Sequence, residues 1–137
     1  MNKLLMFFGL FAFSLGQISL AAQPGAARQS VYFIEPADST SVTSPFTVRF
    51  GVAGMDVKPL GDMTPGTGHH HLIIDGGAVK QGEAVPMDDK NLHFGKGQTE
   101  TRLTLPPGTH WLTMQFADGA HVSYGPAMAT TINVLVK

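Results

Sequence analysis

Three stretches of the chain alternate apolar and polar residues with a period of two. In residues 46–52, Phe46, Val48 and Phe50 fall on one side, with Thr, Arg and Gly between and after them. Residues 109–117 and 128–136 show the same alternation. Because a β-strand sends successive side chains to opposite faces, this period predicts strands with one face in a core.

Shorter segments of similar composition lie before and between these stretches. No stretch has the 3.6-residue period of a ten-residue amphipathic helix. Gly, Pro, Asp and Ser clusters bound the segments, as is typical of strands joined by turns. We therefore predict an all-β protein, an immunoglobulin-like β-sandwich of about seven short strands. The four further strands are expected at residues 30–34, 69–75, 92–94 and 98–105.

The first residues have the pattern of a secretion signal. A positively charged start at Lys3 precedes an apolar run over residues 4–15, and Ser19 and Ala21 occupy the positions that a signal peptidase recognises. We predict a signal peptide over residues 1–21, a flexible leader over 22–29 and a single domain over 30–137. The apolar run is too short to span a bilayer stably, so we expect no membrane span after cleavage. The expected location is periplasmic or secreted.

Composition narrows the functions that this domain can have. The chain has no cysteine, which excludes disulfides, iron–sulfur clusters and thiolate zinc sites. Nine Lys and Arg against ten Asp and Glu give a formal net charge of −1, with no basic patch. Nucleic acid is therefore not expected as a partner.

Three consecutive histidines carry the most specific chemical signal. They occur at His69, His70 and His71, where a glycine-rich loop enters an apolar segment. In a strand, His69 and His71 share one face, while His70 joins Leu72 on the other. The Cα atoms of the pair lie roughly 6.5 Å apart, so both imidazoles can reach one ion. His70 is expected to face the core or an interface.

A metal site needs further ligands, and the sequence offers several. His93 is the first candidate and His121 the second, since the loops of a sandwich gather at its two ends. Imidazoles suit zinc or copper, and a thioether suits copper(I). Three aspartates, Asp75, Asp88 and Asp89, could ligate directly or orient an imidazole. The predicted metal ligands are His69, His71, His93 and His121, with Met63 and Met87 from the flanking loops.

Three segments resemble the bacterial DUF4399 family, a domain of unknown function found in short exported proteins. The segments are GHHHLIID at residues 68–75, LHFGKGQTE at 92–100 and LPPGTH at 105–110. The resemblance extends from about Val31 to Val136. It implies export and a single small domain, and it associates the triple histidine with His93 without implying an activity.

We predict that the protein binds metal in the periplasm, with a role in metal storage, delivery or protection. Two other functions are alternatives to this prediction. The first alternative is a non-catalytic structural or adhesive module whose partner is an envelope protein or polymer, with structural histidines. An exposed Trp111 would favour this alternative. The second is a hydrolytic zinc site, because three histidines and a water form a catalytic pattern. No nucleophile or phosphate-binding motif is present, so we predict that the protein is not an enzyme. His110 is expected to be structural.

Overall fold

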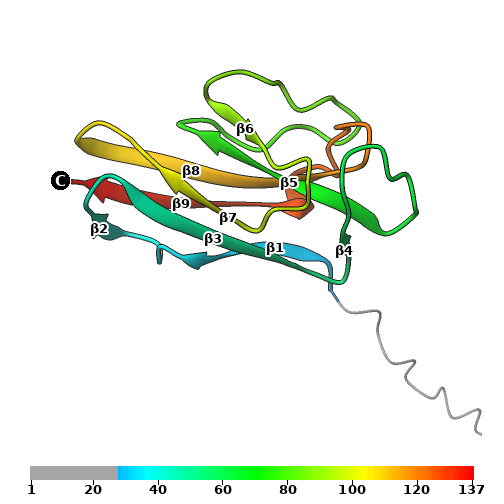
Figure 1. Cartoon of the computed structure of the whole chain (residues 1–137), viewed down its shortest axis with the longest axis horizontal. Helices are drawn as coiled ribbons and strands as arrows, with labels where there is room; N and C mark the ends of the chain where they lie inside the picture. The colour runs from blue at the N-terminus through cyan, green and yellow to red at the C-terminus, as the bar shows by residue number, and fades with distance from the viewer. Residues whose placement is uncertain (1–27) are drawn as a thin grey trace, which may run out of the picture.

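The structure is a computed structural model that describes residues 28–137. The predicted signal peptide and most of the predicted leader lie outside the described residues. Within residues 28–137, no helix is long and apolar enough to cross a membrane. The described part of the chain contains one 3₁₀ turn, η1 (Pro126–Met128), and nine strands (Figure 1). The strands are β1 (Ser30–Glu35), β2 (Thr40–Val42), β3 (Phe46–Ala53), β4 (Asp56–Val57), β5 (Thr67–Ile74), β6 (Asn91–His93), β7 (Glu100–Leu103), β8 (Gly108–Ala117) and β9 (Ala129–Val136).

The strands form two sheets that enclose one core. The smaller sheet has the order β1-β3-β7, and the larger has the order β2-β9-β8-β5-β4, with β6 pairing to β5. β2 runs parallel to β9, and most other pairs are antiparallel. The adjacent strands β5, β8 and β9 correspond to C, F and G of an immunoglobulin fold, opposite a separate A-B-E sheet. The predicted β-sandwich is thus confirmed.

The core consists of the inward faces of both sheets. Phe46, Val48 and Phe50 of β3 are buried, as their alternation predicts. β8 and β9 provide most of the apolar core residues of the larger sheet, because their inward positions also alternate. These residues are Leu112, Met114, Phe116, Ile132, Val134 and Val136.

The sandwich has nine strands where about seven were predicted. β2 and β4 were not predicted because each is only two or three residues long and too short to show alternation. β5 also ends at Ile74, one residue earlier than predicted. Asp75 adopts a left-handed backbone conformation with φ of 54°, which leaves the extended region and stops the ladder.

Strand β5 is buried on both faces, although a sandwich strand normally has one face in water. All eight residues of Thr67–Ile74 are buried. The inner face packs on β3. There the His70 ring contacts the ring of Phe50 in β3 and that of Phe116 in the neighbouring strand β8. The loop between β5 and β6 and the segment after β8 lie over the outer face of β5 (Figure 1). These coverings bury the outer face of β5.

Candidate metal centre

Four histidines converge on the covered face of β5. His69 and His71 project from this face, and His93 of β6 lies directly opposite His71 in the antiparallel register. His121 comes from the loop after β8. One ring nitrogen from each side chain lies within 4.8 Å of the other three. His69 and His71 are buried, whereas His93 and His121 are partly exposed.

The distances between these nitrogens match the size of a metal-coordination sphere. His121 Nδ1 lies 3.4 Å from His69 Nε2 and 3.3 Å from His71 Nε2. The Nε2 atoms of His93 and His69 are 3.0 Å apart. A tetrahedron with zinc–nitrogen bonds of about 2.0–2.1 Å has nitrogen–nitrogen edges of about 3.3–3.4 Å. Three of the six nitrogen–nitrogen distances are therefore close to the spacing that one ion would require, and all six are within 4.8 Å.

The family model described as "Domain of unknown function (DUF4399)" matches residues 48–137, which include all four histidines. The chain belongs to the DUF4399 family. The matched region begins within β3, later than the position near Val31 expected from the motifs. No curated protein and no solved structure matches the chain.

An Asp-centred turn positions His121 in this DUF4399 domain. The Asp118 carboxylate accepts hydrogen bonds from the backbone N–H groups of Ala120 and Val122, at 2.8 and 2.9 Å. The backbone N–H of His121 donates to the Asp118 carbonyl, and His121 has a left-handed φ of 66°. Aspartate commonly organises turns in this way. Asp118 was not predicted as a functional residue, although the adjacent pair Asp118 and Gly119 is a turn signal shortly before His121.

Two glycines allow the loops of the DUF4399 domain to approach closely. A Cβ at Gly119 would lie 2.2 Å from the Asp62 carbonyl oxygen, so only glycine permits this loop to rest on the segment before β5. A Cβ at Gly95 would lie 2.3 Å from Cε1 of His93. Gly95 therefore leaves the space that the His93 ring occupies beside His69.

The environment lowers the pKa values of three imidazoles in the cluster, His69, His71 and His93. Burial, together with the neighbouring imidazoles, lowers the pKa of His69 to about 4 and that of His71 to about 3. Burial also lowers the pKa of His93, and His121 adds to this effect. The nearby Asp118 carboxylate acts in the opposite direction on His69. Since metals bind the neutral ring, the nitrogens remain available as ligands near pH 7.

In each of the two buried ligands, the ring nitrogen that does not face the cluster has no hydrogen-bond partner among the described residues. These atoms are Nδ1 of His69 and Nδ1 of His71. In most metal sites the second ring nitrogen donates to a carboxylate or carbonyl. Here strand packing orients the rings instead, and each unpaired nitrogen carries a desolvation cost of about 1–3 kcal/mol.

The other predicted ligands lie outside the histidine group. Met63 and Met87 are exposed, in the loops before β5 and β6, so ligation by either thioether stays a prediction. The Asp75 carboxylate bonds to His110, and the Asp88 carboxylate accepts hydrogen bonds from Lys90 and Asn91. Asp89 is exposed.

His110 has the structural role that the sequence predicts. Its Nδ1 lies 2.9 Å from Asp75 Oδ2, and its Nε2 lies 2.9 Å from the Pro106 carbonyl oxygen. Both partners accept hydrogen bonds, so both nitrogens carry hydrogen in the protonated ring. The bond to Asp75 is the main cause that raises the pKa of His110. His110 therefore joins the end of β5 to the turn before β8.

Replacing Asp75 by alanine is expected to lower the free energy of unfolding by about 1–3 kcal/mol. The substitution removes the acceptor for His110 and also the acceptor for the Trp111 backbone N–H, 3.0 Å away. Urea denaturation followed by circular dichroism measures the loss. The exposed residue Asp89, changed to alanine, is the control. Equal stabilities of the two variants would contradict this role for Asp75.

Proposed function

We propose that this DUF4399 domain is an exported protein that binds one copper or zinc ion. His69, His71, His93 and His121 would be its ligands. The observation that supports this best is the convergence of four imidazole nitrogens, with spacings of 3.0–3.4 Å between the contacting pairs. Such a site suits metal storage, delivery or protection in the periplasm.

Binding is favoured over hydrolysis by the number of ligands. Catalytic zinc sites generally have three protein ligands and one open position for water. Four imidazoles would fill a tetrahedral sphere, which leaves no position for a reacting water. The absence of cysteine restricts the ligands to imidazole, carboxylate and thioether, and imidazole suits both copper and zinc.

The direct test is titration of metal-free protein with zinc and with copper(II). We expect one ion per chain, measured by calorimetry against a competing chelator. The double variant His69→Ala/His71→Ala should bind at least about 100-fold more weakly, since it loses both buried ligands. His110→Gln, a histidine change outside the cluster, should bind like the wild type. Equal affinities of the wild type and the double variant would overturn the proposal.

The two methionines are tested separately with copper(I). A Met63→Leu/Met87→Leu variant keeps the apolar character of both loops and removes both sulfurs. If either thioether ligates, this variant should bind copper(I) more weakly while its zinc affinity stays unchanged. Unchanged copper(I) affinity would exclude both methionines as ligands.

Gly95→Ala is expected to weaken metal binding by at least about tenfold without removing any ligand. The new methyl group would overlap the His93 imidazole and displace it from His69. Gly77→Ala is the matched control, because a Cβ there meets nothing within 4 Å. The same calorimetric titration provides the comparison. Equal affinities of these two variants would show that His93 does not contribute to binding.

The proposal of export rests on the signal-like pattern of residues 1–21. We expect the exported protein to begin after Ala21. Measurement of its intact mass tests this, and a mass that includes residues 1–21 would contradict it.

A further inference from the structure

The outward face of the larger sheet carries two exposed apolar side chains far from the four clustered histidines. Trp111 is 57% exposed and Leu135 is 44% exposed. Trp111 lies six residues before Ala117, the partner of His69 in the β5–β8 register, or about 20 Å along the strand. Tryptophan is enriched at interfaces, because its large apolar ring and its polar N–H can both find partners there.

Polar, uncharged groups surround these two residues. Asn133 lies directly opposite Trp111 across the β8–β9 pair, and Leu135 lies opposite Thr109. Ser41 of β2 lies opposite Leu135 on its other side. Residues directly opposite in a sheet share a face, with Cβ atoms about 4.5–5.5 Å apart. The surface therefore combines one aromatic ring, one aliphatic side chain, hydroxyl groups and an amide.

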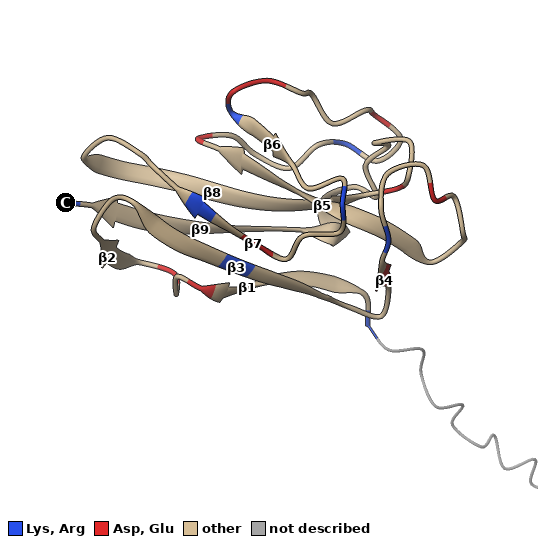
Figure 2. Ribbon diagram, in the orientation of Figure 1, with Lys and Arg blue, Asp and Glu red and all other residues tan. Residues whose placement is uncertain are grey.

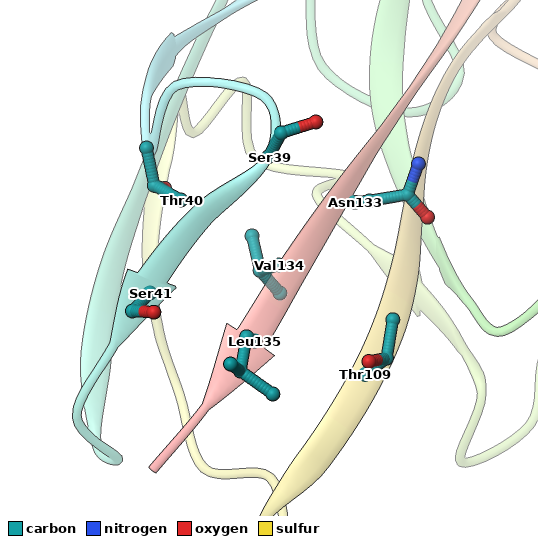
Figure 3. A pocket seen from close by; sticks show the side chains of 7 residues that line it. All are labelled: Ser39, Thr40, Ser41, Thr109, Asn133, Val134 and Leu135. Carbon is teal, nitrogen blue, oxygen red and sulfur yellow. The ribbon is translucent and has the colours of Figure 1, made fainter.

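A hollow of about 350 Å³ lies in this surface (Figure 3). It is formed by the edge strand β2, the turn before it, and the neighbouring strands β9 and β8. No charged residue lines it. The lining residues are Ser39, Thr40, Ser41, Thr109, Asn133, Val134 and Leu135.

The two strands that carry most of this face, β8 and β9, contain no lysine, arginine, aspartate or glutamate. Charged residues lie instead on β3, β7 and the loops (Figure 2). The nearby Asp38 and Asp75 carboxylates accept hydrogen bonds from the backbone N–H groups of Asn133 and Trp111. A strongly charged ligand would find no opposite charge in the hollow, so a neutral ligand is favoured.

We propose that this face, defined by Trp111, Asn133, Leu135, Thr109 and Ser41, binds neutral carbohydrate. A sugar ring has a face of C–H groups, which packs on an aromatic ring, and a rim of hydroxyls that both donate and accept hydrogen bonds. Serine and threonine hydroxyls and the Asn133 amide can also donate and accept. This site is independent of the proposed metal centre and gives the domain a second ligand.

The single tryptophan of the chain makes the test specific. Trp111 is the only tryptophan, so intrinsic fluorescence reports directly on this face. The full exported protein is titrated with cellohexaose and chitohexaose as neutral probes and with hexagalacturonate as a charged one. We expect a saturable fluorescence change with at least one neutral hexasaccharide and none with the charged one.

Two variants and a control assign the binding to this face. Asn133→Ala retains the fluorophore and should weaken binding at least about fivefold. Trp111→Ala should abolish binding in calorimetry. Tyr32→Ala removes an exposed aromatic of β1, in the other sheet, and should leave affinity unchanged. Three outcomes would overturn the proposal: no response to either neutral probe at millimolar concentration, preferential binding of hexagalacturonate, or equal weakening by Tyr32→Ala.

Discussion

Adding a small excess of zinc or copper(II) to metal-free protein is expected to raise its melting temperature by more than about 10 °C. A ligand that binds only the folded state stabilises it by about 4 kcal/mol at a concentration 1,000 times its Kd. For a domain of this size, each kcal/mol shifts the melting temperature by several degrees. An ion would also replace the close contacts between the converging imidazole nitrogens with coordination bonds. Calorimetric melting with added metal, against a chelator-treated sample, measures the shift.

The controls for this melting experiment are variants of the cluster and of its surroundings. His69→Ala/His71→Ala should show no metal-dependent shift of the melting temperature. In this variant the folded and the unfolded states are expected to bind metal equally weakly, so metal favours neither state. His110→Gln should melt at a lower temperature than the wild type yet keep the full shift. A shift of the same size in the wild type and the double variant would mean that the metal acts elsewhere.

The second large effect is acid destabilisation of metal-free protein. Between pH 7 and pH 4 we expect a loss of several kcal/mol from the free energy of unfolding, which in proteins is about 5–15 kcal/mol in total. Unfolded histidines titrate near pH 6.5, whereas burial lowers the pKa of His70 to about 4 and of His71 to about 3. In this window the unfolded chain binds protons that the folded chain does not. Stability is therefore complete above about pH 6.5 and falls as the pH drops toward the folded pKa values.

The contribution of the histidines to acid destabilisation can be separated from the contribution of the carboxylates. The folded environment lowers the pKa values of Asp62, Asp75 and Asp88, so their contributions are lost only below about pH 4. Within residues 28–137, neither ring nitrogen of His70 has a hydrogen-bond partner, and the ring packs between Phe50 and Phe116. His70→Leu removes one such buried base and should make the urea midpoint less dependent on pH between 7 and 4.5. Identical pH dependence in the wild type and this variant would contradict the explanation.

Strand periodicity predicted most of the sandwich but not its covering. The alternation at Phe46, Val48 and Phe50 identified an inward face, because a half-buried strand imposes a period of two on its sequence. The same reasoning correctly separated His70 from the pair His69 and His71. It could not show that the outer face of β5 is also buried, since that burial depends on loops with no periodic pattern.

The convergence of the four histidines was only partly predictable. His93 was expected near the pair because the next short strand can pair with β5, and the structure places it directly opposite His71. His121 ranked below it, since sequence gives no direct measure of where a loop returns. The position of this residue depends on the Asp118 turn and on the close approach permitted by Gly119. Both are local signals whose meaning becomes clear only when the neighbouring loop is known.

The order of events during folding is a further consequence of where the ligands lie in the chain. His69 and His121 are 52 positions apart, and β6, the loop with Gly95, β7 and β8 lie between them. Contacts between distant parts of a chain form late, because closing the intervening loop is entropically costly. The complete cluster therefore exists only after β5 and β8 have paired in register. Metal is expected to change the unfolding rate of this domain far more than its folding rate.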